Sequence, residues 1–462
     1  MADLCDLNAS ELLAGYRNKK FSPSDAMTSV LARVASWEPR LNALYAFDAE
    51  GARAEAAKSS ARWARGAPAG ALDGVPITIK ENIATRGTPL PLGTAATTLA
   101  PAPDDAPPAA RAREAGAIIF AKTTMPDYGM LSSGLSSFHP LTRNPWNLAM
   151  NPGGSSAGAA AAAAAGYGPL HIGTDIGGSV RLPAGWCGIY TLKPSAGRVP
   201  IDPPYVGRVA GPMTRTVGDA ALLMSVLSKP DWRDPMSLPP ADIPWLELDG
   251  LSLKGLRIGL MSEAGAGLDV LPEVRDAVRG AARAFEAQGA IVEPAAPVLT
   301  RAMLDGLDNF WRARAWDDLV RLSPETRAKV LPYIVEWAYR AVALSGIEVL
   351  RGFNRIVEMK KAAAAMFRPF DFVISPTCPV PTYPAELASP INDPARPFEH
   401  IGFTVVWNMT DHPAASINCG FTAAGLPIGL QIVGRRFDDL GVLRLSAAYE
   451  RLQGVPRPWP RP

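Results

Sequence analysis

Two serines and an upstream lysine are the residues whose types and spacing best fit a chemical reaction. Each serine, Ser155 and Ser179, directly follows a pair of glycines, and Lys80 precedes both. Glycines let the backbone turn sharply and aim several N–H groups at one point. Attack on a carbonyl carbon needs a nucleophile and a stabilised oxyanion. A hydroxyl among converging amides therefore points to acyl transfer.

Ser179 is the candidate nucleophile. Residues 170–173 read as a strand that leads into a glycine turn, and the serine then opens a short helix. The amides of this turn are expected to form an oxyanion hole, namely those of Ile176, Gly177, Gly178 and Ser179. The alternative is a glycine-rich loop that caps a helix or holds a phosphate, and the turn alone does not decide between them. No GxxxxGK[ST] motif supports a P-loop.

A serine nucleophile needs a base, and the four histidines do not supply an obvious one. Each of them fits a loop or the edge of the core: His139, His171, His400 and His412. Lysine is the other common base, but its ordinary pKa of about 10.4 keeps it protonated at neutral pH. Lys80 ends the apolar strand 75–80, where burial would lower that pKa. The competing interpretation is a strand-end lysine whose ammonium reaches solvent.

Ser155 can bridge the lysine and the nucleophile. A hydroxyl donates one hydrogen bond while accepting another, so Ser155 can relay a proton from Ser179 to Lys80. The neighbouring Ser156 can bond locally. The alternative for this pair is the N-cap of the alanine-rich helix predicted over 158–166, a role that one serine can fill while the other catalyses.

The composition is typical of a globular protein. Hydrophobic residues make up 48% of the 462 residues and charged residues 19%, so a large core is expected. The net charge is +2, from 46 basic and 44 acidic residues, which leaves no electrostatic signature of nucleic acid or a membrane. The four cysteines are far apart and lack metal-ligand spacing, which favours reduced thiols in the cytoplasm. No secretory signal is visible at the N-terminus.

Strand and helix patterns alternate along most of the chain. Strands are expected at residues 117–121, 256–261, 290–292 and 372–376, with helices at 108–115, 216–227 and 272–288 between or before them. This alternation indicates an α/β fold. We expect a single domain over residues 1–462, with a helical, aromatic-rich insertion at about 300–370 and a proline-rich loop at about 229–250.

These segments together resemble the amidase signature family over roughly residues 5–230 and 370–452. The resemblance is carried by seven motifs: Gly74–Lys80, Asn151–Gly158, Gly173–Arg181, Leu192–Pro200, Gly211–Val217, Ser375–Thr377 and Gly425–Gly434. It implies a mixed, twisted central sheet flanked by helices on both faces. It also implies Lys80 as the neutral base, Ser155 on a cis peptide as the relay and Ser179 as the nucleophile. No cofactor and no metal are implied.

Two positions depart from the family pattern, and neither disturbs the triad. Glu81 follows the lysine where aspartate is usual, and Ala157 replaces a glycine after the serine pair. Asp175 and Arg181 match family positions that are expected to support the serine turn by hydrogen bonds.

The resemblance implies an amide hydrolase that forms a seryl acyl-enzyme with a small-molecule substrate and water. The family's acyl pocket corresponds partly to residues 127–134, and Gly129, Met130 and Thr174 are expected to contact substrate. Neither this loop nor the insertion shows an obvious charged clamp. An apolar or aromatic amide, anilide or carbamate is therefore favoured, with esterase or urethanase side activity.

Two other functions stay open, as does the oligomeric state. One is the A subunit of a glutamyl-tRNA amidotransferase, a glutaminase that works within a complex. The alanine-rich helical insertion and the lack of an RNA-facing surface argue against it. The other is a binding protein that kept the scaffold, against which the intact lysine and serines argue. The sequence is compatible with a monomer or a homodimer.

Overall fold

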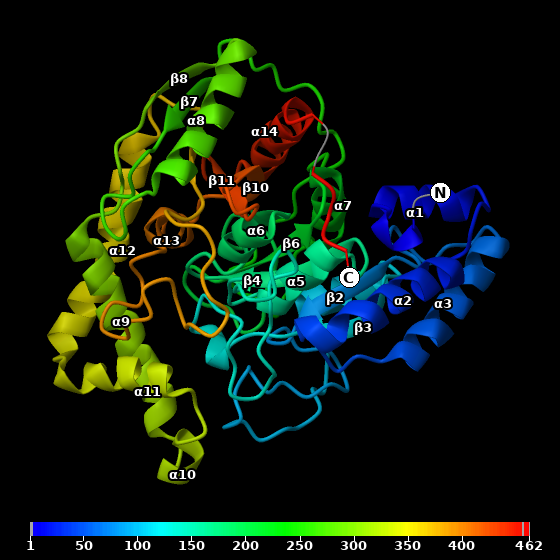
Figure 1. Cartoon of the computed structure of the whole chain (residues 1–462), viewed down its shortest axis with the longest axis horizontal. Coiled ribbons are helices and arrows are strands. Elements are labelled where there is room, and N and C mark those ends of the chain that lie inside the picture. Colours follow the sequence, from blue (N-terminus) through cyan, green and yellow to red (C-terminus); the bar gives the residue numbers. More distant parts are fainter. Residues whose placement is uncertain (1–2, 455–456, 462) are drawn as a thin grey trace.

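One mixed sheet of 11 strands runs through the computed structural model, which describes residues 3–454 and 457–461 (Figure 1). The strand order is β1-β3-β2-β4-β6-β5-β10-β11-β9-β7-β8. Neighbours are parallel in the β3-β2-β4 and β9-β7-β8 groups and antiparallel elsewhere. The strands are β1 (Leu44–Tyr45), β2 (Pro76–Lys80), β3 (Ile118–Thr123), β4 (Leu170–Asp175), β5 (Tyr190–Lys193), β6 (Val209–Thr214), β7 (Arg257–Leu260), β8 (Ile291–Pro294), β9 (Phe372–Pro376), β10 (Ala414–Phe421) and β11 (Pro427–Gly434).

Helices cover both faces of this sheet, which confirms the predicted α/β fold. The helices that precede the insertion are α1 (Ala9–Arg17), α2 (Pro23–Leu41), α3 (Ala49–Ala64), α4 (Pro107–Glu114), α5 (Ala157–Ala165), α6 (Arg181–Cys187), α7 (Val217–Leu227) and α8 (Pro272–Ala287). The helices that follow it are α13 (Gly402–Met409) and α14 (Asp439–Leu452). Short 3-10 turns occur at η1 (Leu4–Asp6), η2 (Asp127–Gly129) and η3 (Arg340–Ala343).

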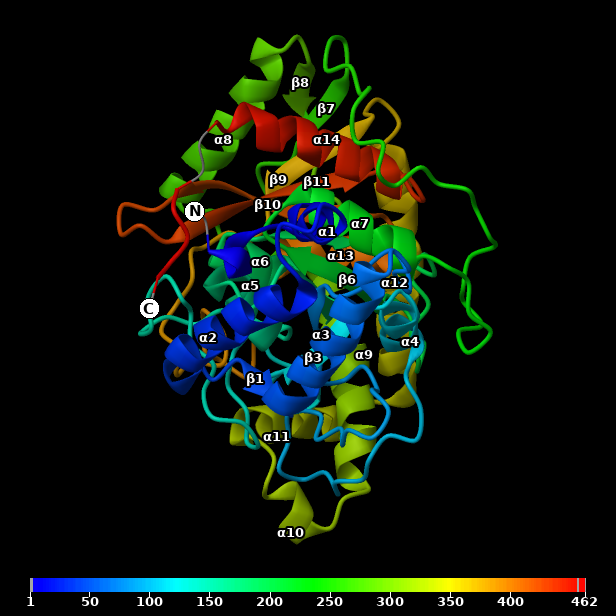
Figure 2. The ribbon, with the colours of Figure 1, turned by 90° about the vertical axis from the view of Figure 1, so that its right-hand side faces the viewer.

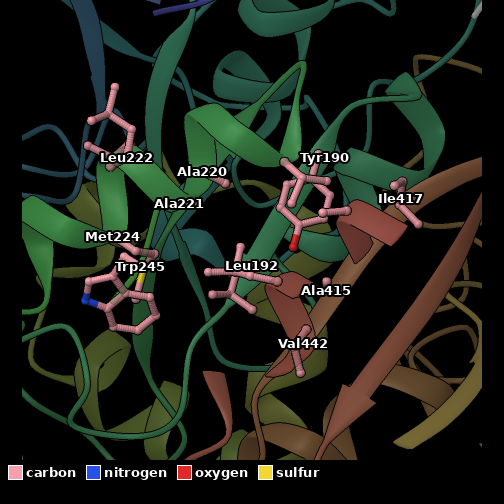
Figure 3. Close-up of a cluster of buried hydrophobic side chains, with 14 of the residues drawn as sticks. Tyr190, Leu192, Ala220, Ala221, Leu222, Met224, Trp245, Ala415, Ile417 and Val442 are labelled. Carbon is pink, nitrogen blue, oxygen red and sulfur yellow. The ribbon is translucent and has the colours of Figure 1, made fainter. Parts of the chain in front are cut away.

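One face of the sheet packs against α4, α7, α8 and α14 in a single large apolar cluster. Figure 3 shows part of it, where side chains of α7, β5, β10 and α14 meet around Tyr190, Leu192 and Trp245. The opposite face carries α5, α6 and α13. The N-terminal α2 and α3 pack beside β3 at the edge of the sheet (Figure 2). Because successive strand residues face opposite sides, each strand serves both layers.

The segment expected to be a helical insertion forms α9 (Arg301–Val320), α10 (Pro324–Arg327), α11 (Pro332–Tyr339) and α12 (Gly346–Met366). The long α9 and α12 lie side by side at the left of Figure 1. Their apolar residues join the cluster that contains α13 and the ends of β9 and β11. Residues 228–256 contain no regular helix or strand and form the green loop at the right of Figure 2. Of the helices in the described ranges, none is long and apolar enough to cross a membrane.

Candidate active site

The alternation along β2 directs Lys80 into the interior. Ile77 and Ile79 belong to the apolar cluster under α4 and α7. Thr78 and Lys80 therefore face the other side, toward α5 and the serine turn that precedes it. Lys80 is completely buried, so its ammonium does not reach solvent. The strand-end lysine that extends into water is thus excluded as an interpretation.

Lys80 Nζ contacts both serines that precede α5. It lies 2.8 Å from Ser155 Oγ and 3.0 Å from Ser156 Oγ. Burial lowers the pKa of Lys80 well below its ordinary value, and the charge of Arg208 lowers it further. The carboxylates of Asp175 and Glu81 oppose this shift without cancelling it. The structure therefore favours a neutral amine at this position, as a general base requires.

Ser156 is a partner of Lys80 and does not cap α5 through its side chain. An N-cap was the alternative interpretation of the serine pair, but the Ser156 hydroxyl makes no cap hydrogen bond. It donates instead to the Thr174 carbonyl at 3.1 Å. Because its only proton is used there, Ser156 Oγ must accept from Lys80 Nζ. A neutral Lys80 that donates one N–H to Ser156 has a lone pair that can accept the proton of Ser155.

The turn that carries Ser155 is tied to two distant loops by Asn151. The Asn151 side-chain oxygen accepts from the amides of Gly153 and Gly134, at 2.9 and 3.1 Å. Its amide nitrogen donates to Ser133 Oγ at 2.8 Å and to the Ala385 carbonyl at 3.0 Å. The Gly154–Ser155 peptide bond is cis, in agreement with the expectation from the resemblance.

Asp175 and Arg181 hold the Ser179 turn, as expected. Asp175 accepts from the Gly178 amide at 2.8 Å and the Val180 amide at 3.1 Å, and Arg181 pairs with it at 3.0 Å. Burial alone would raise the pKa of Asp175, but the Arg181 charge holds it well below its usual range. Gly178 has a φ of +131°, and a Cβ there would lie 2.5 Å from Thr404 Oγ1, so only glycine fits.

The expected oxyanion donors are only partly available. The Gly178 amide was predicted to face substrate, but its bond to Asp175 uses this N–H. The amides of Ile176, Gly177 and Ser179 have no acceptor among the residues that the structure describes. An aspartate three residues before a glycine can form such a local turn bond, and this competing bond removes one of the four predicted donors.

A backbone hydrogen bond holds Ser179 beside Ser156, one of the two serines that contact Lys80. The Ser179 carbonyl accepts from the Ser156 amide at 3.1 Å, and its side chain is half-buried. Its hydroxyl forms no hydrogen bond with any described residue, Ser155 included. The structure thus brings Lys80, Ser155 and Ser156 into direct contact and places Ser179 beside them with a free hydroxyl.

Of the expected substrate contacts, Gly129 is beside the serine centre and Thr174 is not free. A Cβ built on Gly129 would lie 3.3 Å from Ser155 Oγ. Met130 is half-buried and packs with the apolar cluster of the insertion. Thr174 Oγ1 instead accepts from Asn82 Nδ2 at 3.1 Å, inside the protein. Thr174 therefore supports Ser156 and Asn82, and we do not retain it as a substrate contact.

Trp311 and Ile401 cover the oxyanion turn, and no sequence pattern identified them. A Cβ on Gly177 would lie 3.3 Å from the Trp311 ring and 3.4 Å from Ile401 Cδ1. The two residues come from α9 and the segment before α13, far from Gly177 in the sequence. A pattern in one sequence cannot report such contacts, because the tertiary fold alone brings these segments together.

Three of the four histidines have hydrogen-bond partners other than the serines, while His400 has none among the described residues. His171 is buried against Thr78, and His139 contacts Glu81. All four cysteines are free. A cavity of about 630 Å³ lies between the N-terminal segment and β10, but none of the predicted site residues lines it.

Comparison with known proteins agrees with this geometry. The amidase family model matches residues 25–443. The chain is 34% identical to an acylamidase of Rhodococcus erythropolis, over 98% of this chain and 96% of the relative. It is 35% identical to the A subunit of the glutamyl-tRNA(Gln) amidotransferase of Myxococcus xanthus, over 97% of each.

A solved structure of a bacterial aryl acylamidase of the amidase signature family superposes with a TM-score of 0.89 and 30% identity. It covers 98% of this chain and 99% of that one. A 6-aminohexanoate cyclic dimer hydrolase superposes with a TM-score of 0.87 and 27% identity, with 98% of each chain covered. Both the family model and the relatives span nearly the whole chain, so this protein belongs to the amidase signature family and is an amide hydrolase.

Proposed function

We propose that this amidase hydrolyses an apolar or aromatic amide or anilide through an acyl-enzyme on Ser179. The observation that carries the proposal is the contact of the buried Lys80 amine, whose pKa is lowered by burial, with Ser155 Oγ at 2.8 Å. Beside it stand the free hydroxyl of Ser179 and the three unbonded amides of its turn. A base, a relay, a nucleophile and oxyanion donors are the parts that amide hydrolysis needs.

In the proposed reaction, Ser179 Oγ attacks the carbonyl carbon while its proton passes to Ser155 Oγ. The Ser155 proton passes at the same time to the Lys80 lone pair. The amides of Ile176, Gly177 and Ser179 stabilise the oxyanion. Lys80 then returns a proton through Ser155 to the leaving nitrogen, and the C–N bond breaks. Water attacks the acyl-enzyme by the same relay and restores Ser179.

Apolar surroundings support the choice of substrate. Tyr128, Met130, Ile176 and Phe310 are partly buried side chains that pack against the cluster containing Trp311. Aromatic rings and apolar side chains favour an aromatic or aliphatic acyl or amine group over a small polar one. The resemblance to an acylamidase and to an aryl acylamidase points the same way. Carbamates and esters are expected as weaker substrates.

The test is a panel of anilide, primary amide, carbamate and ester with one acyl group, on wild type and Ser179→Ala. We expect the anilide or the primary amide to react best, and Ser179→Ala to lose at least about 10³-fold in kcat. Ser225→Ala is a matched control, because that hydroxyl only donates to the Leu222 carbonyl within α7. Retained activity in Ser179→Ala would refute the acyl-enzyme.

A second candidate function comes from the similarity to amidotransferase A subunits. Such a protein would release ammonia from glutamine within a complex. We therefore include glutamine in the panel, alone and with the partner proteins of an amidotransferase. Glutaminase activity that appears only with these partners, and depends on Ser179, would replace the small-amide function.

A further inference from the structure

Arg208 lies beside the oxyanion turn. It directly precedes Val209, which pairs with Asp175 across β6 and β4. The turn that precedes Arg208 is tied to Asp175 by Asn408. The Asn408 side-chain nitrogen donates to the Gly207 carbonyl at 3.0 Å and to Asp175 at 2.8 Å. The charge of Arg208 contributes to the lowered pKa of Lys80. The guanidinium is therefore within electrostatic range of the catalytic amine.

A second arginine reaches the same place from the insertion. Arg314 of α9 stacks on the Tyr205 ring, with its Cζ 3.8 Å from the ring centroid. Tyr205 and Arg208 form one tight turn, in which the Arg208 amide donates to the Tyr205 carbonyl at 3.0 Å. Arg314 also lies one helical turn after Trp311, which covers Gly177. The two arginines thus come from segments that adjoin the turn carrying Ser179.

Neither arginine is neutralised by a carboxylate. Within the described ranges no acidic oxygen lies within 4.0 Å of either guanidinium. Arg208 Nη1 donates to the Pro203 carbonyl at 2.8 Å, and Arg314 donates to no described residue. Burial and the Arg314 charge lower the pKa of Arg208 to about 10, and the Asp202 charge opposes this shift. Asp318, which lies one helical turn after Arg314 on α9, acts electrostatically on Tyr205.

This pairing is unusual for the chain. Arg208 is half-buried and Arg314 is exposed, whereas the buried Arg181 and Arg198 meet the carboxylates of Asp175 and Asp439. The Arg314 charge acts on Arg208, so the two guanidinium groups repel each other, and an anion bound to both would relieve this repulsion. A guanidinium carries a fork of N–H donors that matches the geometry of a carboxylate.

We propose that Arg208 and Arg314 form an anion subsite that binds a carboxylate of the substrate at a position away from the scissile amide. The inference rests on the proposed amide hydrolysis and names its substrate class: an amide with an apolar or aromatic body and an anionic end. It corrects the expectation that the insertion offers no charged clamp. No sequence pattern could identify Arg314 as part of this subsite, because its partner, Arg208, is more than a hundred residues away in the chain.

The test uses two matched pairs of anilides. On the acyl side, the mono-4-nitroanilide of glutaric acid is compared with 5-oxohexanoic 4-nitroanilide, in which a methyl ketone replaces the carboxylate. On the amine side, a 4-carboxyanilide is compared with the 4-acetylanilide of the same acid. We expect the anionic member of one pair to be favoured in kcat/KM by at least about tenfold, the usual size of a charge-assisted contact.

Arg208→Gln and Arg314→Gln should each reduce that ratio toward one, and lysine at either position should restore part of it. Arg321→Gln is the matched control, since Arg321 is exposed and pairs with Asp317 at the end of α9. Removal of Arg208 also raises the pKa of Lys80, because a repelling charge is lost. The ratio cancels this effect, which acts on both members of a pair.

Binding of the same compounds to Ser179→Ala, measured by calorimetry, gives a readout without turnover. Equal kcat/KM for both members of both pairs, or ratios that neither glutamine variant changes, would overturn the subsite while amide hydrolysis stands. Arginine-dependent preference for the anionic compounds in binding, without Ser179-dependent hydrolysis in wild type, would uphold the subsite and refute the proposed function.

Discussion

At the scale of single residues, the proposed mechanism depends on the protonation state of the buried Lys80 amine. Lys80 has no counterion in contact, and its two hydrogen-bond partners are hydroxyls. Ser156 accepts from the amine because its own proton goes to the Thr174 carbonyl. With one N–H directed to Ser156, the lone pair of a neutral Lys80 Nζ can accept the proton of Ser155. Burial supplies the neutral state, and Ser156 orients it.

Lys80→Met should abolish amide hydrolysis and change how stability depends on pH. Between the lowered pKa of Lys80 in the fold and its ordinary pKa near 10.5, the unfolded chain binds a proton that the native protein does not. Wild-type stability therefore rises with pH relative to the variant, by about 1.4 kcal/mol per pH unit. Denaturant unfolding at a series of pH values below 10.5 measures this slope. In wild type, kcat/KM should rise as Lys80 loses its proton and then level off.

Lys122 is the matched control for this experiment. It lies opposite Ile79 on β3, and burial lowers its pKa to about 7. Its amine donates to Thr85 Oγ1 at 2.6 Å, away from the serines. The stability difference between wild type and Lys122→Met should change with pH by a similar slope. This variant should keep its activity and the rise of kcat/KM with pH (the acid limb of the profile). Loss of the acid limb in Lys122→Met would mean that Lys80 is not the titrating base.

At the scale of elements, loops position the reactive groups and helices only support them. The turn before α5 is fixed by Asn151, which joins it to the loops at Ser133 and Ala385. The turn after β4 is fixed by Asp175 and Arg181. The two turns meet where the Ser156 amide donates to the Ser179 carbonyl. The relay geometry therefore depends on side-chain anchors from distant parts of the chain.

Gly154→Ala should disturb the Ser155 turn. A Cβ at this position would lie 2.5 Å from the Ser133 nitrogen and 2.6 Å from its oxygen, both in the backbone. We expect a loss of about 1–3 kcal/mol in the free energy of unfolding, as in other overpacked sites, and a lower kcat. Gly218→Ala in α7 is the control, because nothing lies within 4 Å of its Cβ. It should be neutral or stabilising by up to about 1 kcal/mol. Equal stability and activity for the two variants would contradict the packing argument.

At the scale of the whole molecule, the helical insertion contacts the loops and turns around the serine centre. The Leu331 amide, just before α11, donates to Asp127 at 3.2 Å in the loop that lines the serine centre. Trp311 reaches Gly177, and Arg314 reaches Tyr205. Lys80 comes from β2 and the two serines come from turns beside the sheet, while α9 and the segment before α11 lie over them. We therefore propose that the sheet layer carries the chemistry and that the insertion influences substrate choice.

Trp311→Ala should weaken binding of aromatic substrates. Loss of the indole next to Gly177 removes apolar contact, so KM for an aromatic anilide should rise by about tenfold or more, with a smaller effect on a short aliphatic amide. Trp316→Ala is the control, since Trp316 packs on Tyr339 and Arg327 instead. Truncation of a buried tryptophan also costs about 3–5 kcal/mol, so KM is compared below the unfolding range of both variants. An unchanged substrate ratio in Trp311→Ala would remove this residue from the pocket.

Local patterns in the sequence predicted the elements well. The apolar alternation before Lys80 and the strand before Gly177 are both present as β2 and β4. The α/β class followed from the alternation of strand and helix patterns along the chain. It was predictable because local propensity and periodicity agree with the final fold. The serine interpretation needed more than one motif, since each glycine turn alone also fits a cap or a phosphate loop.

The sequence by itself determined which residue types are available for chemistry and the strands and turns that carry them, because short-range geometry depends on near neighbours. Only the tertiary structure decided that Lys80 is fully buried, that Asp175 takes the Gly178 amide, and that Ser156 bonds to Lys80 instead of capping α5. It also placed Trp311 against Gly177 and Arg314 on the Tyr205 ring. Burial, competition for a hydrogen bond and contact between distant segments arise from the packed chain, and no single stretch of sequence encodes them.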